Sequence, residues 1–210
     1  MTDAAVGAGH SPPSYLEVAP GRYREDEGLR YEDYVVGTVF EHRPGRTITA
    51  TDNIWSSLLC LNTHPLHIDA VYAAQTPFGK LLVSSLVTFG VVNGMTVKTV
   101  SQKAIANLGW DKVRLTAPVF VGDTLYAETT ITGKRPSGSR PGEGIVTVHT
   151  VGRNQDGAQV IEFDRTVLAS MTKPGGIDDC YSGDRARRGR GEGRRRDLPG
   201  VHRIRLLRRA

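Results

Sequence analysis

Apolar positions recur at helical spacing in three stretches of the first half of the chain. The first stretch follows Thr51, which we expect to cap the helix, and it should end before Pro65 because the residue preceding a proline is driven out of helical conformation. The second is a short helix over residues 69–75 with an acidic start. The third runs from about residue 83 to 97 and is apolar on nearly every side, as is typical of a helix buried in a core.

Period-two alternation predicts strands in the rest of the chain. An Asp-Gly pair at residues 156–157 suits a tight hairpin between the last two strands, and the Pro- and Gly-rich residues 135–144 should form an exposed loop. One long apolar helix and about five antiparallel strands indicate an α+β fold in which the sheet wraps around the helix. The expected strands lie at residues 31–49, 113–120, 124–134, 144–153 and 159–171.

Length and composition fit one globular domain. With 210 residues, of which 39% are hydrophobic, the chain can bury a core without a disulfide or metal staple. We expect the domain to span residues 22–173, after a flexible leader at residues 1–21 that lacks the apolar run of an export signal. Cys60 and Cys180 lie far apart and have no metal-type spacing, which favours a reducing, cytoplasmic setting.

The formal net charge of +5 originates at the end of the chain. Residues 174–210 hold eleven arginines and five acids, a balance of +6 that leaves the remainder at −1. This Arg- and Gly-rich tail could be a nucleic-acid arm or a disordered appendage. Tyr181 is its only aromatic residue, so it offers little for base stacking, and we expect nucleic acid not to be a partner. The apolar stretch at 81–97 is interrupted by polar residues and glycines, which favours a core helix over a membrane span.

Reactive side chains are densest in residues 62–69, which read Asn-Thr-His-Pro-Leu-His-Ile-Asp. A histidine can take a proton from water near neutral pH, and the amide of Asn62 could orient that water, so this segment could catalyse hydration or dehydration. His64 and His67 could equally be surface or capping residues. Together with Asp69 they could also bind a metal, but the intervening proline prevents the regular helix that would align both imidazoles. We therefore expect neither a metal nor a cofactor.

The same segment resembles the hydratase signature of the MaoC-like dehydratase family, which includes the (R)-specific enoyl-CoA hydratases. The family pattern, Asp-x-Asn-Pro-Leu-His-x-Asp, is similar to residues 62–69, and the resemblance extends over residues 28–173. It includes Thr-Pro-Phe-Gly at 76–79 and Gly-Asp-Thr-Leu at 122–125. The resemblance implies a single hot-dog fold and reversible addition of water to a 2-enoyl-CoA. It also implies a homodimer or higher homo-oligomer with active sites between the subunits.

By motif position, the resemblance assigns His67 as the catalytic histidine and puts Asn62 where the family has a catalytic aspartate. An amide cannot accept a proton as a carboxylate does, so Asn62 can only position water, and His67 must supply most of the base function. Asp69 is a candidate replacement acid or a residue that orients His67, and its simpler role is a helix cap. His64 is a further candidate for contacting the substrate.

The resemblance places the thioester carbonyl near the start of the central helix, where unpaired backbone N–H groups can stabilise the developing oxyanion. These positions are Val83, Ser84 and Ser85, and the two serine hydroxyls are either additional donors or simple caps.

Residues 104–111 and 135–137, together with Asn62-Thr63, look most like the mesaconyl- or itaconyl-CoA hydratase-like branch. The implied substrate is a short branched acyl-CoA with a second carboxylate, which Arg114 or an arginine of the 135–140 loop could bind.

Two other functions stay open. The first is a hot-dog thioesterase. Many such enzymes resemble one another in placing an acidic residue on the central helix to activate water, but residues 81–97 contain no acidic residue. A catalytically silent acyl-CoA-binding protein would explain why an asparagine replaces the family's aspartate.

Overall fold

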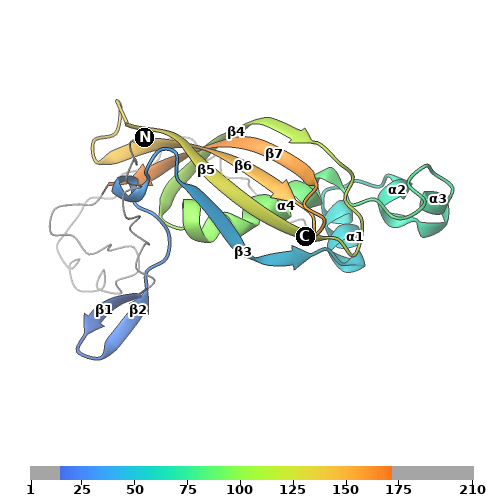
Figure 1. Cartoon of the computed structure of the whole chain (residues 1–210), viewed down its shortest axis with the longest axis horizontal. Coiled ribbons are helices and arrows are strands. Elements are labelled where there is room, and N and C mark those ends of the chain that lie inside the picture. The colour runs from blue at the N-terminus through green and yellow to red at the C-terminus, as the bar shows by residue number, and fades with distance from the viewer. Residues whose placement is uncertain (1–14, 172–210) are drawn as a thin grey trace, which may run out of the picture. The chain divides into compact units, whose positions relative to one another are not determined.

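The computed structural model describes residues 15–171 of the chain (Figure 1). The predictions for residues 1–14 and for the Arg-rich tail at 174–210 lie outside the described residues. Within the described range, no helix is both long and apolar enough to cross a membrane.

The described chain starts with an antiparallel hairpin formed by β1 (Tyr15–Ala19) and β2 (Arg22–Glu25). Gly21 makes the turn with a φ of 70°, a conformation that glycine adopts at little cost. The Gly21 N–H also donates to the side chain of Glu17 at 2.9 Å. Residues 15–21, which the composition assigned to a leader, form a strand and a turn.

A five-stranded antiparallel sheet forms the main body of the structure, and it curves around the helix α4 (Ser85–Met95) (Figure 1). This arrangement is the predicted α+β layout of an antiparallel sheet wrapped around one long helix. In spatial order the strands are β3 (Val39–Thr47), β5 (Thr124–Pro136), β6 (Glu143–Arg153), β7 (Gln159–Ser170) and β4 (Ala104–Leu115).

Two strands differ from their predicted bounds by more than two residues. The strand predicted at 31–49 begins only at Val39, because Tyr31–Asp33 forms a 3₁₀ helix (η1) in which Asp33 accepts a hydrogen bond from the Arg30 N–H at 2.8 Å. The strand predicted at 113–120 is instead the end of β4, which starts at Ala104. Polar residues and a glycine interrupt the apolar alternation of β4, so periodicity alone does not reveal its first half.

Four helical elements besides α4 and η1 shape the remainder of the described chain. The predicted short helix after Asp69 and the predicted helix near 83–97 are confirmed by α3 and α4. The elements are α1 (Ala50–Leu59), α2 (Pro65–Ile68), α3 (Ala70–Ala74) and the π-helical turn η2 (Val97–Ser101).

The N-cap of α1 is Thr49, two residues before the predicted Thr51. Thr49 Oγ1 accepts a hydrogen bond from the Asp52 N–H at 3.1 Å, and the Asp52 carboxylate accepts one from the Thr49 N–H at 2.8 Å. These reciprocal bonds satisfy two donors at the helix start. The bond from the Thr49 N–H, together with a second bond from the Thr49 hydroxyl, lowers the pKa of the Asp52 carboxyl.

The apolar side of α1 faces away from the core, whereas a core helix would bury that side. Trp55 is 69% exposed and Leu59 77% exposed, whereas the buried side chains of this helix are the polar Asn53 and Ser57. The apolar spacing that predicts α1 therefore identifies a surface that the single chain leaves uncovered.

The core lies between the sheet and α4. One face of β5 is buried as predicted, through Leu125, Ala127, Thr129 and Ile131. Leu125 and Ala127 pack in one cluster with side chains from α4 and β7, including Val87, Val92, Ile161 and Phe163.

His42 on β3 is a buried histidine whose surroundings disfavour its charged form. Its Nε2 lies 2.8 Å from Thr129 Oγ1, which in turn lies 2.9 Å from Thr150 Oγ1. Burial, and to a smaller extent the positive charge of Arg43, lowers the pKa of His42 from 6.5 to about 4. Between these two pH values the unfolded chain binds a proton at this position that the folded chain does not bind.

We therefore expect the free energy of unfolding to fall by about 2 to 3 kcal/mol through His42 as the pH drops from neutral to about 4.5. Above the unfolded pKa both states are neutral at this position, so His42 adds no pH dependence there. Urea unfolding of wild type and His42→Asn at both pH values measures the effect. The variant should lose most of the wild-type pH difference, and an unchanged difference would contradict the expectation.

Candidate active site

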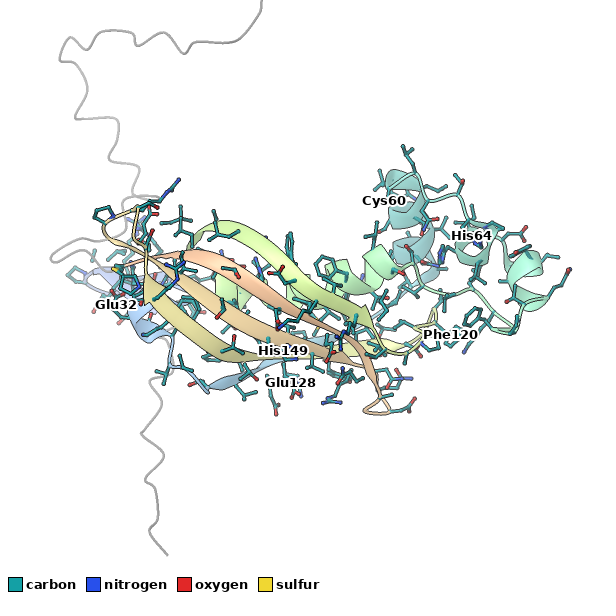
Figure 2. All side chains as sticks on the ribbon, turned by 90° about the horizontal axis from the view of Figure 1, so that it is seen from above. Glu32, Cys60, His64, Phe120, Glu128 and His149 are labelled. Atoms are coloured by element: carbon teal, nitrogen blue, oxygen red, sulfur yellow. The ribbon has the colours of Figure 1, made fainter. Side chains whose placement is uncertain are left out.

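Residues 62–69, which carry the predicted chemistry, lie beyond the end of the sheet, together with α1, α2 and α3 (Figures 1 and 2). After α1 the chain reverses at Leu61, which has a positive φ of 56°, and the Asn62 N–H donates to the Ser57 carbonyl at 2.8 Å. His64 then caps α2, because its Nδ1 accepts from the Leu66 N–H at 3.2 Å. The predicted bend thus contains one short helical turn.

His67 is half-buried, and one ring nitrogen is held by the backbone. Its Nδ1 lies 2.9 Å from the carbonyl oxygen of Leu82. A carbonyl oxygen can only accept a hydrogen bond, so Nδ1 carries the proton in the neutral ring and Nε2 presents a lone pair. Among residues 15–171, Nε2 has no hydrogen-bond partner. It can therefore accept a proton from water.

Asn62 is joined to the start of α4. Its Nδ2 lies 3.4 Å from Ser84 Oγ, and its Oδ1 accepts from the His64 N–H at 3.2 Å. Because His67 is bound to Leu82 and Asn62 to Ser84, both side chains lie against the same short segment before α4. The structure thus brings together the two residues that the sequence places at the centre of the chemistry.

Asp69 serves as the cap of α3. Its Oδ1 accepts from the N–H groups of Val71 and Tyr72 at 2.9 and 3.0 Å. Within residues 15–171 the carboxylate makes no hydrogen bond to His67, and its local geometry is that of the simpler role, a helix N-cap. The exposed His64 ring lies next to that of His67, with 5.9 Å between the ring centroids.

The backbone donors proposed for the oxyanion are not equivalent. The Val83 N–H donates to the Val119 carbonyl at 2.8 Å, and the Ser84 N–H donates to Asn53 Oδ1 at 2.9 Å. Neither group is free for a substrate. Ser85 is the first residue of α4, where an N–H group has no acceptor within the helix. Of the three predicted positions, Ser85 alone therefore offers a donor suited to an oxyanion.

An open groove of about 310 Å³ runs beside Ser85. Its lining is mostly apolar, and none of its residues is charged. The groove residues are Phe78, Leu82, Val83, Ser85, Thr88 and Leu115–Val119.

Arg114 lies on the face of the sheet that points away from α4. In β7, Phe163 packs in the core with α4, and its neighbour Glu162 points to the opposite face. Arg114 Nη1 lies 3.7 Å from Glu162 Oε1. The same outer face holds His149 (labelled in Figure 2), whose Nδ1 lies 2.8 Å from Asp164 Oδ1. The structure therefore does not bring Arg114 to the His67 cluster.

Asn53 is a residue of this site that the sequence did not reveal. It is fully buried on α1, and its amide contacts His67, Leu82 and Ser84. The one signal in the sequence was the position of Asn53 inside a predicted helix and close to the reactive residues 62–69. An asparagine buried at such a position is costly unless its amide is fully hydrogen-bonded.

An antiparallel sheet around one helix, with a histidine and an amide at the start of that helix, defines a hot-dog-fold protein with a candidate water-handling site. Residues 33–155 match the family model described as MaoC like domain. The chain belongs to this MaoC-like family.

Known proteins resemble this chain in sequence, and solved structures resemble it in fold. A mesaconyl-CoA hydratase of Cereibacter sphaeroides is 34% identical over 145 residues, which are 69% of this chain and 42% of that protein. The solved MaoC-like dehydratase of Rhodospirillum rubrum has a TM-score of 0.63 at 28% identity and covers 70% of this chain and 100% of its own. A Mycobacterium tuberculosis protein with a double hot-dog fold has a TM-score of 0.63 at 24% identity, over 79% of this chain and 53% of its own.

The chain spans about half the length of the curated relatives it matches.

Proposed function

We propose that this protein is a hydro-lyase that reversibly adds water to the double bond of a short enoyl-CoA thioester. The observation that carries the proposal is the geometry of His67, whose Nδ1 is held by Leu82 and whose Nε2 is left to act as a base. The similarity to a mesaconyl-CoA hydratase supports the same reaction class.

In the proposed reaction, His67 Nε2 takes a proton from a water molecule that the Asn62 amide orients. The water oxygen forms a bond to the β-carbon of the enoyl group, and the electron pair of the double bond moves toward the thioester carbonyl. The Ser85 N–H stabilises the resulting enolate oxygen. The His67 imidazolium then returns its proton to the α-carbon, which leaves a 3-hydroxyacyl-CoA and a neutral histidine.

The groove beside Ser85 suits a short apolar acyl chain, because its lining is largely apolar and it carries no charge. For a branched dicarboxylic substrate such as mesaconyl- or itaconyl-CoA, a cation must approach the groove from elsewhere. We infer that a second protomer supplies it, because no charged residue within 15–171 lines the groove and Arg114 is paired with Glu162 on the outer face.

The test is a spectrophotometric assay of the purified protein with crotonyl-, mesaconyl- and itaconyl-CoA. Loss of the absorbance of the conjugated enoyl thioester, without release of free thiol, is the expected result. Release of free thiol would indicate a thioesterase. Substrate binding without either change would indicate the silent acyl-CoA-binding protein that Asn62 makes a real alternative.

We also propose that the protein is a cytoplasmic homodimer. The strand β4 lies at one edge of the sheet and exposes apolar side chains along its length, such as Leu108, Val113 and Leu115. An unpaired apolar edge is a template for a further strand, and a twofold axis would pair β4 with its own copy. The exposed free thiol of Cys60 supports a reducing compartment.

A Leu108→Glu change should convert the dimer to a monomer, because each new carboxylate would be buried without a partner among the apolar side chains of the paired edges. Sedimentation velocity measures the oligomeric state. The matched control is Val39→Glu on β3, the other edge strand, since Val39 is 53% exposed and Leu108 51% exposed. A dimer that survives Leu108→Glu and dissociates with Val39→Glu would place the interface on β3.

A further inference from the structure

The buried face of α1 is polar where it meets the candidate active site. Asn53 is 0% exposed and Ser57, one helical turn later, is 1% exposed. Buried polar side chains are costly unless hydrogen bonds compensate them. These two differ sharply, because Asn53 is fully bonded whereas Ser57 Oγ has no hydrogen-bond partner within residues 15–171.

The Asn53 amide connects α1 to the α2 turn and to the segment before α4, which a backbone hydrogen bond from the Leu82 N–H to the Leu66 carbonyl at 3.2 Å also joins. Its Nδ2 donates to the carbonyl of His67 at 2.9 Å and to the carbonyl of Leu82 at 3.2 Å. Its Oδ1 accepts from the Ser84 N–H at 2.9 Å. Two donor hydrogens and one acceptor oxygen are thus matched to two carbonyls and one N–H, which also fixes the orientation of the amide.

The Leu82 carbonyl is the point where this network meets the proposed base. Its oxygen accepts from Asn53 Nδ2 and also from His67 Nδ1. Asn53 therefore holds the His67 backbone directly and holds the acceptor that sets the His67 tautomer. By binding the Ser84 N–H, it also fixes the residue that precedes Ser85 at the start of α4.

We propose that Asn53 is the positioning residue of this site, which sets the tautomer of His67 and its place relative to the first free N–H of α4. This inference rests on the proposed function for its effect on turnover. Its effect on the His67 ring depends on the structure alone.

The chemistry of the position favours asparagine over side chains of similar size. Leucine would leave the His67 carbonyl and the Ser84 N–H without their side-chain partner in a buried place, and the Leu82 carbonyl would keep only its bond from His67. Aspartate would put anionic oxygens against the same two carbonyls and could accept only from the Ser84 N–H. Serine is smaller and could replace one of the three bonds.

The experiment compares wild type, Asn53→Leu and Asn53→Ser in the full chain, with Ser57→Ala as the matched control. Ser57 lies on the same buried face of the same helix, and its hydroxyl makes no bond that the alanine would lose. Thermal unfolding identifies the variants that are folded. If Asn53→Leu does not fold, Asn53→Ser carries the test.

The first readout is ¹⁵N NMR of the His67 ring without substrate. Wild type and Ser57→Ala should show the Nδ1–H tautomer, and the Asn53 variants should show a mixture of the two tautomers. The second readout is turnover, where the Asn53 variants should lose about 10- to 100-fold in kcat with KM changed by less than about threefold. Ser57→Ala should keep both constants.

A folded Asn53 variant with the wild-type tautomer would overturn the proposal, as would an equal loss of kcat in Ser57→Ala. If wild type hydrates none of the enoyl thioesters but the tautomer changes as expected, the proposed function fails and the positioning role stands.

Discussion

Replacement of His67 by alanine is expected to lower kcat for enoyl-CoA hydration by about 10²- to 10⁴-fold. The reason is that His67 is the group with an unprotonated nitrogen held next to the start of α4, and the adjacent Asn62 cannot accept a proton. Alanine removes the base while leaving the backbone contacts of the segment, including the bond from Asn53 Nδ2 to the His67 carbonyl.

The measurement is the initial rate of loss of the enoyl thioester at saturating substrate. The control is His149→Ala, since His149 is a histidine of similar partial burial on the outer face of the sheet, and that variant should keep the wild-type rate. A His67→Ala enzyme that retains more than about a tenth of the wild-type rate would show that another group supplies the base.

Replacement of Asn62 by aspartate is expected to raise kcat by about 10- to 100-fold, because a carboxylate can share the proton transfer that His67 now performs alone. The site can accept this change. The Ser84 hydroxyl can turn to donate to the new carboxylate, and the His64 N–H already donates to Oδ1 of the asparagine. Among the described residues, the amide nitrogen of Asn62 bonds only to the Ser84 hydroxyl, which can reverse its role, so the loss of this donor leaves no other group unpaired.

The same rate measurement tests this expectation, with Asn62→Ala as the matched control. Alanine can neither accept a proton nor orient water, so that variant should be slower than wild type. If aspartate and alanine slow the reaction equally, Asn62 is not in contact with the reacting water. If wild type is silent and Asn62→Asp is active, the asparagine is the reason for the silence.

Local periodicity was sufficient for much of the fold. The strands β5, β6 and β7 and the helices α3 and α4 were predictable because each repeats its apolar positions at one spacing and ends at turn or capping residues. The apolar pattern of α1 predicted the helix but not whether its apolar side faces the core. An apolar stripe shows which side avoids water, and it cannot show whether the same chain or another protomer covers that side.

The site was predictable where it is continuous in sequence and not where it depends on contacts over long separations. His67 and Asn62 lie in one motif, whereas Asn53 reaches Leu82 and Ser84 across 29 and 31 residues. Arg114 shows a second limit. The face of the sheet on which Arg114 lies follows from the register between β4 and β7. That register shifts between Asp111 and Arg114, and no local sequence pattern reveals the shift.

The carbonyl oxygen of Leu82 has a consequence for how this site tolerates mutation. It is a backbone atom, so every side chain at position 82 presents the same oxygen to His67 and Asn53. An alanine scan would score Leu82 only for its contribution to the groove and would miss its hold on the base. An amide-to-ester exchange of the 82–83 linkage weakens the carbonyl as an acceptor and also removes the bond from the Val83 N–H to Val119. Compared with the same exchange of the 118–119 linkage, which weakens acceptance at Pro118 instead, it would expose a dependence that sequence variation conceals.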